Sequence, residues 1–311
     1  MSIVPTPRTR AAGAAYAAGG YLIWGVLPLY FLLLLPTGPW EVVAARVLFS
    51  FVFCLLLLTV ARGWRRILAI IRQPRLLGWT ALAGVLIYIN WQVFLIGTLS
   101  GHVVETALGY FINPITTVLL GVFVLHERIR RLQWVAIGIA VIAVIVIIVA
   151  YGSFPWIALS LTASFGLYGL VKKRIGPSVD AVSGLTLESF WLLPVAIVLL
   201  IVVAQTTGIT FGTVSVWHTL LMLFAGVATA VPLLLFAAGT RRINLTVIGM
   251  IQFMTPIMQF LTGVLILHEP MPPERWVGFI LVWIAVGVFI IDLLLATRSL
   301  AHRYPSVPPA P

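Results

Sequence analysis

Long apolar stretches, separated by short polar segments, follow one another along almost the whole chain. A helix needs about 20 residues to cross the roughly 30 Å hydrocarbon core of a bilayer, and about ten stretches reach that length. The pattern therefore predicts ten membrane-spanning helices. We expect them at Ala12–Leu34, Glu41–Ala61, Leu76–Leu99, Val103–Leu125, Leu132–Ala150, Phe154–Val171, Leu185–Ala204, Val216–Gly239, Asn244–Leu267 and Arg275–Ala296.

One part of this pattern occurs twice. Pro114–Trp134 and Pro256–Trp276 share Pro, Gly, Leu-His-Glu and Trp at a constant offset of 142 residues. The same offset aligns Ala-Gly-Val at residues 83–85 with Ala-Gly-Val at residues 225–227. Because each copy holds an odd number of spans, the second copy enters the membrane from the opposite side. Inverted repeats of this kind build many secondary transporters.

The repeat predicts an all-α integral membrane protein of ten transmembrane helices, arranged as two inverted five-helix repeats. We expect a cytoplasmic N-terminus at residues 1–10, a first repeat at residues 11–151 and a second, inverted repeat at residues 152–297. The Pro-rich end predicts a disordered cytoplasmic tail at residues 298–311.

Composition and charge agree with a membrane protein. Apolar residues make up 61% of the chain and charged residues 9%, against roughly 25% charged residues in soluble domains. Of the 19 Lys and Arg residues, 17 fall on alternate loops and the two termini, which predicts a plasma-membrane protein with cytoplasmic termini. We expect these cations to meet anionic lipid headgroups rather than nucleic acid.

Several chemistries lack their sequence signals. The single Cys54 excludes a Cys-based metal cluster, and the sequence has neither a Gly-rich phosphate loop nor a His-Glu-x-x-His pair. The two Leu-His-Glu elements lie at span ends, where two ligands each cannot close a metal site. The sequence therefore predicts no cofactor, no metal and no enzymatic activity.

Two prolines lie near the middle of predicted spans. Pro114 and Pro256 each remove a backbone hydrogen bond, to the carbonyls of Tyr110 and Gln252 respectively. Carbonyls freed at mid-membrane depth must meet protein, water or ligand. We expect Pro114 and Pro256 to act as hinges.

Ionisable residues within spans are costly and are functional candidates by default. Glu41, Arg46, Glu105 and Glu188 are such residues, and Glu41 and Glu188 are expected near opposite mouths of the transport path. A Glu in the first turn of a helix also complements the helix dipole, so that explanation stays open for Glu41 and Glu188. For Arg46 we expect a partner on another helix, with Glu105 as the first candidate. A purely structural role for such a buried pair is the alternative.

Amide and aromatic residues at membrane depth predict a cavity for an amphipathic organic molecule. The candidate lining residues are Trp24, Asn90, Trp91, Tyr110, Asn113, Tyr168 and Gln252.

Several phrases together resemble the RarD family, an EamA-type branch of the drug/metabolite transporter superfamily. The most specific is Leu-Gly-Tyr-Phe-Ile-Asn-Pro at residues 108–114; Tyr-Leu-Ile-Trp-Gly at residues 21–25 and Asn-Trp at residues 90–91 accompany it. The resemblance runs from about Ala15 to Asp292. It implies ten helices in two inverted repeats, a central cavity and transport of small organic solutes.

These features predict a secondary transporter that exports small organic metabolites or drugs by alternating access, with protons as the candidate coupling ion. An uptake permease of the same fold, an intramembrane enzyme and a structural membrane partner are the alternatives. An intramembrane enzyme would need a cluster of His and acidic residues at one membrane face together with large polar loops, and the sequence offers neither.

Overall fold

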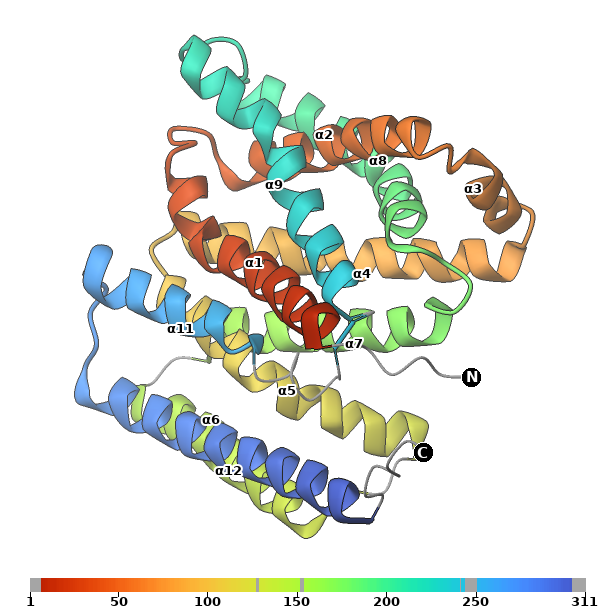
Figure 1. Cartoon of the computed structure of the whole chain (residues 1–311). Coiled ribbons are helices and arrows are strands. Elements are labelled where there is room, and N and C mark those ends of the chain that lie inside the picture. The colour runs from red at the N-terminus through yellow and green to blue at the C-terminus, as the bar shows by residue number, and fades with distance from the viewer. Residues whose placement is uncertain (1–6, 127–128, 152–153, 241, 244–250, 304–311) are drawn as a thin grey trace, which may run out of the picture. The chain divides into compact units, whose positions relative to one another are not determined.

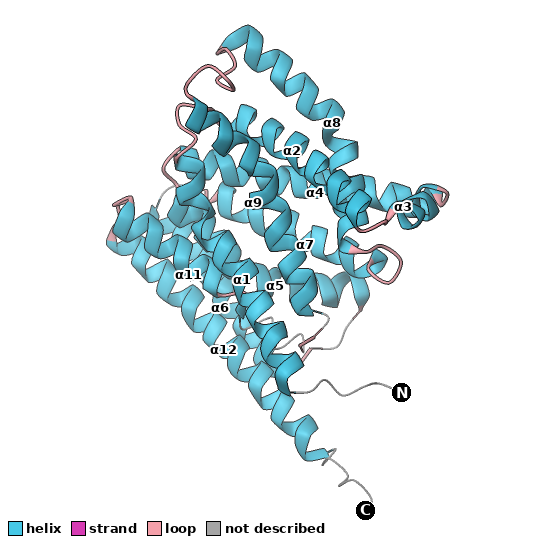
Figure 2. Ribbon diagram, turned by 45° about the horizontal axis from the view of Figure 1, so that its top comes forward, coloured by secondary structure: helices cyan, strands magenta, loops and turns pink. Residues whose placement is uncertain are grey.

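A computed structural model of the chain describes residues 7–126, 129–151, 154–240, 242–243 and 251–303. Within these residues the secondary structure is helical, without strands (Figure 2). The helices are α1 Pro7–Leu32, α2 Pro39–Val60, α3 Trp64–Ile71, α4 Pro74–Leu99, α5 Val103–Leu125, α6 Arg131–Tyr151, α7 Trp156–Ile175, α8 Ala181–Thr206, α9 Val216–Thr240, α11 Met254–Leu261, the π-helix η1 Thr262–Ile266 and α12 Pro273–Arg303.

Local sequence signals set the starts of several helices. Pro39 and Pro74 lie in the first turns of α2 and α4, where proline already has a helical φ and its missing N–H removes no helical hydrogen bond. Asp180 caps α8, because its side chain accepts a hydrogen bond from the Ser183 N–H.

Eight of the described helices are long and apolar enough to cross a membrane. The predicted sixth and ninth spans correspond to shorter apolar helices, Trp156–Lys172 and Met254–Ile266. Residues 244–250 of the predicted ninth span and residues 304–311 of the predicted tail lie outside the described residues. The chain is therefore a multi-pass helical membrane protein.

The structure adds one helix that the span pattern did not predict. The short helix α3 lies in the basic segment between the second and third predicted spans and buries Ile67 and Ile70. Its length of 8 residues is far below what a membrane crossing needs.

The histidines of the two Leu-His-Glu elements share an unusual backbone conformation. His126 directly follows α5 with φ 54°, and His268 follows η1 with φ 51°. Non-glycine residues seldom adopt positive φ, so its occurrence at both repeated positions marks the same kind of helix ending. Glu127 lies outside the described residues.

The chain divides into two compact units, Met1–Leu120 with Trp156–Pro270 and Gly121–Pro155 with Met271–Pro311. In the first unit, α1 packs on α9, α2 packs on α8 and α9, and α4 packs on α7 (Figure 1). This unit therefore combines helices from both halves of the sequence.

The second unit is built on the pair α6 and α12, which lie side by side (Figure 1). Gly278 of α12 lies against Ile147 of α6, so the two helices approach closely at this point. Arg130, just before α6, donates from Nε to Asp292 Oδ1 of α12 over 2.8 Å.

Glycines in the first unit allow other helices to approach closely. Gly226 of α9 lies against the backbone of Phe49 in α2, and Gly84 of α4 lies against the backbone carbonyl of Glu188 in α8. Helices inside a membrane associate mainly through such close packing, because lipid tails are as apolar as their side chains. The two glycines stand 142 residues apart, at equivalent positions of the sequence repeat.

We expect Gly226→Ala to destabilise the protein, because the added Cβ would overlap the backbone carbonyl group of Phe49. Overpacking of this kind lowers the free energy of unfolding by about 1–3 kcal/mol. Thermal unfolding of the detergent-purified protein measures the change. Gly169→Ala in α7 is the control, since a Cβ at position 169 meets nothing within 4 Å. Equal unfolding temperatures for the two variants would contradict the proposed close contact.

Candidate functional site

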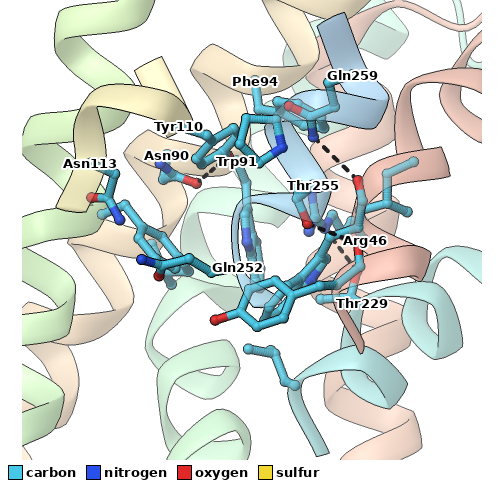
Figure 3. Close-up of a pocket in the computed structure, with 17 residues that line it drawn as sticks. Arg46, Asn90, Trp91, Phe94, Tyr110, Asn113, Thr229, Gln252, Thr255 and Gln259 are labelled. Carbon is cyan, nitrogen blue, oxygen red and sulfur yellow. Dashed lines mark hydrogen bonds between the residues drawn. The ribbon is translucent and has the colours of Figure 1, made fainter. Parts of the chain in front are cut away.

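A cavity lies inside the first unit, between helices of both sequence halves (Figure 3). Helices α1, α2, α4, α5, α7, α9 and α11 contribute to its wall, and aromatic side chains form much of it. Its lining residues are Tyr21, Trp24, Leu27, Arg46, Ile87, Asn90, Trp91, Phe94, Tyr110, Asn113, Phe165, Thr229, Leu233, Gln252, Thr255, Pro256 and Gln259.

Arg46 is the cationic residue in this wall and is only 3% exposed. Its Nε donates a hydrogen bond of 2.8 Å to Thr229 Oγ1, and the Thr229 hydroxyl donates in turn to the Ala225 carbonyl. The guanidinium carbon lies 4.3 Å from the ring centroid of Trp91 and 5.4 Å from that of Phe31. Aromatic faces attract cations, so both rings stabilise the charge in this position. Nη1 is buried and has no hydrogen-bond partner.

The predicted pairing of Arg46 with Glu105 is wrong. Glu105 Oε1 accepts hydrogen bonds from the backbone N–H groups of Ile157 at 3.0 Å and Ala158 at 3.5 Å. These two groups belong to the first turn of α7, where N–H groups lack helical partners and carry partial positive charge. The Glu105 carboxylate thus caps the start of α7, and Glu105 does not line the cavity.

Asn90 holds a hydrogen-bond network at the cavity wall. Its Nδ2 donates to the Leu161 carbonyl over 3.1 Å and to Ser164 Oγ over 3.2 Å. Its Oδ1 accepts from the Tyr110 hydroxyl over 3.1 Å. Because both ends of the amide are engaged, Asn90 fixes the position of the Tyr110 phenol relative to α4 and α7.

The remaining predicted cavity residues divide into two groups. Trp24, Trp91, Asn113 and Gln252 line the cavity, and Asn113 and Arg46 lie on opposite sides of the view in Figure 3. Asn113 Oδ1 is buried without a hydrogen-bond partner. Tyr168 is not part of the lining.

Glu188 and Tyr168 belong to a separate cluster in the first unit. Lys172 Nζ donates to Glu188 Oε1 over 2.6 Å, and the Tyr168 hydroxyl donates to Glu188 Oε2 over 3.1 Å. Glu188 is 1% exposed, and the Lys172 ammonium and the Tyr168 phenol donate to its two buried oxygens.

Glu41 connects α2 to the segment before α9. Its carboxylate accepts hydrogen bonds from the backbone N–H groups of Thr210 and Phe211 at 2.9 Å, and also from the Thr210 hydroxyl. Neither Glu41 nor Glu188 lines the cavity. Glu41 lies in the first turn of α2, where it complements the helix dipole, but its hydrogen bonds go to the loop residues Thr210 and Phe211.

The two prolines that were predicted as hinges have different surroundings. Pro114 lies inside α5. Pro256 lies in the first turn of α11 and lines the cavity. Proline in a first turn removes no helical hydrogen bond. The loss of a backbone hydrogen bond that was predicted for both prolines therefore applies to Pro114, which lies inside its helix, more than to Pro256.

Three further polar residues belong to the wall, and two of them, Thr229 and Gln259, were not predicted from the sequence. The Thr229 hydroxyl accepts the hydrogen bond from Arg46 Nε. The Thr255 hydroxyl donates to the Tyr21 carbonyl, and Gln259 Nε2 donates to the Trp24 carbonyl over 3.2 Å. Gln259 Oε1 remains buried without a partner. Gln252, Thr255 and Gln259 stand three and four residues apart, a spacing that puts polar groups on one helix face and was available in the sequence.

Comparison with known proteins places this geometry in a family context. The model of the EamA-like transporter family matches residues 11–149 and again residues 154–291. Protein RarD of Streptomyces exfoliatus is 40% identical over 300 residues, which cover 96% of this chain and 95% of that protein. Protein RarD of Escherichia coli (strain K12) is 37% identical over 286 residues, covering 92% and 96%.

Two further relatives extend this comparison. The uncharacterized transporter YojE of Bacillus subtilis (strain 168) is 38% identical over 293 residues, covering 92% of this chain and 96% of that protein. A protein of known crystal structure superposes with a TM-score of 0.58 at 14% identity, covering 89% of this chain and 96% of that one. The structural likeness at this low identity concerns the fold alone.

We expect Lys172→Met to destabilise the protein strongly, because it leaves the Glu188 carboxylate buried without its cation. Breaking a buried ion pair on one side costs about 3–5 kcal/mol. The double variant Lys172→Met/Glu188→Gln is the control: it removes the charge as well and should recover most of the loss. Thermal unfolding of the three proteins provides the measurement. A single variant as stable as the wild type, or a double variant no better than the single one, would contradict the prediction.

Proposed function

Because the chain belongs to the RarD branch of the EamA-like transporter family, we propose that it is a secondary transporter that exports small organic metabolites or drugs across the plasma membrane. It works by alternating access between two inverted five-helix repeats, at residues 11–151 and 152–297. Both termini are cytoplasmic, as the basic alternate loops favour.

The cavity of the first unit is the observation that carries this proposal. It is lined from both sequence halves, by Arg46, Asn90 and Tyr110 from the first and by Thr229 and Gln259 from the second. A site shared by two repeats can open to either side when the repeats change their relative position. A few polar groups within an aromatic wall are what an amphipathic solute requires.

Matching helix contacts support the inverted arrangement. Gly84 brings α4 against α8, and Gly226 brings α9 against α2. In each contact one helix comes from the first half of the sequence and the other from the second. The glycine belongs to the first half in the contact of α4 with α8 and to the second half in the contact of α9 with α2. Such a pair of equivalent contacts is expected from two repeats that are related by a pseudo-twofold axis.

A transport assay tests the proposal. Purified protein is reconstituted into proteoliposomes that are loaded with a mixture of small organic metabolites, and mass spectrometry follows each compound in the external medium. Protein-dependent, saturable release of particular compounds is expected, with the rate responding to an imposed pH gradient if protons are coupled. Sidedness is determined by protease treatment of the exposed termini, which separates export from uptake. Release no faster than from empty liposomes would refute transport.

We expect Asn90→Leu to lower the transport rate about fivefold. The change removes the acceptor of the Tyr110 hydroxyl and so frees a phenol of the cavity wall. One lost hydrogen bond of ordinary strength, about 1 kcal/mol, corresponds to about a fivefold change. Gln92→Leu is the matched control, because Gln92 is a buried amide on the same helix outside the cavity lining. Equal rates for the two variants would remove Asn90 from the site.

A further inference from the structure

We propose that the cavity binds a small organic anion, a monocarboxylate with an aromatic or otherwise apolar body, and that Arg46 is the residue that receives the carboxylate. This inference rests on the proposed transport function and adds the chemical class of its substrate. It follows from the charges inside and around the cavity, from the free hydrogen-bonding groups and from the aromatic wall.

The charge of Arg46 has no acidic partner in the described structure. Each of the six acidic side chains that the structure describes, out of eight in the chain, is engaged elsewhere. Glu127 and the side chain of Glu274 lie outside the described part. These six acidic side chains accept hydrogen bonds from the following residues: Glu41 from Thr210 and Phe211, Glu105 from Ile157 and Ala158, Asp180 from Ser183, Glu188 from Lys172, Glu269 from Val103 and Val104, and Asp292 from Arg130.

The groups that do contact Arg46 only partly compensate its charge. Thr229 accepts one hydrogen bond from Nε, and the rings of Trp91 and Phe31 offer their faces. All three are neutral. Buried charges in proteins are normally paired with an opposite charge, because burial removes the water that would otherwise solvate them. A bound anion completes this arrangement, and Nη1, which is buried and has no partner, is free to donate to it.

The single charge and the shape of the guanidinium indicate which anion fits. The guanidinium is a planar fork that binds carboxylate or phosphate through two parallel hydrogen bonds. A phosphate monoester carries about 1.5 to 2 negative charges at pH 7, whereas a carboxylate carries one. One uncompensated cation therefore matches a carboxylate, since a phosphate would leave excess negative charge in a water-poor cavity.

The rest of the wall suits the body of such a molecule. Trp24, Trp91, Phe94, Tyr110 and Phe165 surround the cavity with aromatic rings. Among the polar lining atoms, Gln259 Oε1 and Asn113 Oδ1 are buried acceptors that lack a donor. The carboxylate of such a molecule would accept from Arg46 Nη1, its ring would contact the aromatic wall, and an N–H group on the ring would donate to one of these two acceptors.

Probes that share a ring system and carry side chains of different charge test this proposal. Indole-3-acetate, indole-3-acetamide and tryptamine share one ring system and are respectively anionic, neutral and cationic; phenylacetate, phenylacetamide and phenethylamine form a second set. Ligand-induced shifts of thermal unfolding, measured on the full-length protein in lipid nanodiscs at pH 7.5, give an affinity for each probe. The carboxylate of each set is expected to bind at least about tenfold more tightly than its amide, and the amine most weakly.

Variants then assign the preference to Arg46. In Arg46→Gln the carboxylate and the amide should bind equally, while Arg46→Lys should retain part of the preference because it keeps the charge. Arg174→Gln is the matched control and should behave as the wild type, since the Arg174 guanidinium lies over Trp79 and outside the cavity. If Arg46→Gln fails to fold, the wild-type ranking together with Arg46→Lys still decides.

Three results would overturn the proposal: amides or amines that bind as tightly as the carboxylates, a carboxylate preference that survives in Arg46→Gln, or no shift with any carboxylate. These outcomes differ from a failure of the transport proposal. Proteoliposomes that release neutral solutes without competition from carboxylates would keep transport and refute the anion. Carboxylate binding that depends on Arg46, without any release of solute, would keep the site and refute transport.

Discussion

The membrane interior offers no water to polar groups, and this constraint explains where the carboxylates of this protein lie. The Glu105 carboxylate accepts a hydrogen bond from a backbone N–H group at the start of α7. The Glu269 carboxylate accepts hydrogen bonds from the N–H groups of Val103 and Val104 at the start of α5. Glu41 does the same for Thr210 and Phe211. Each acid joins the unpaired N–H groups of one segment to another segment that is distant in sequence. These carboxylates therefore connect helices, and their charges are compensated away from the cavity.

The cavity wall holds buried polar groups for which this compensation is incomplete. Arg46 keeps a free buried nitrogen, and Gln259 and Asn113 each keep a free buried oxygen. Buried polar groups are nearly always hydrogen-bonded, so unsatisfied groups that line a common cavity need an explanation. A ligand that binds there supplies the missing partners. The same groups then account for affinity and for selectivity, because an unsuitable ligand would leave them unpaired.

The sequence predicted the content of the cavity better than its connections. Arg46, Asn90 and Tyr110 were recognisable as polar or charged groups at membrane depth, and the structure places all three in one wall. The partner of Arg46 was not predictable, because it is the hydroxyl of Thr229, an unremarkable residue of an apolar helix more than 180 positions away. Gln259 was overlooked although it follows Thr255 by four residues and Gln252 by seven, a spacing that puts the three side chains on one face of a helix.

The sequence alone determined the membrane class, the positions of most spans and the existence of a repeat. These follow from the length of apolar stretches and from matching residues at a constant offset, because a helix satisfies its own backbone hydrogen bonds wherever it is placed. Only the tertiary structure decided that Glu105 caps α7, that Glu188 pairs with Lys172 and that Arg46 has no acidic partner among the described residues. Partners of this kind depend on which helices pack together, and the helix-forming sequence of each segment contains no information about its neighbours in space.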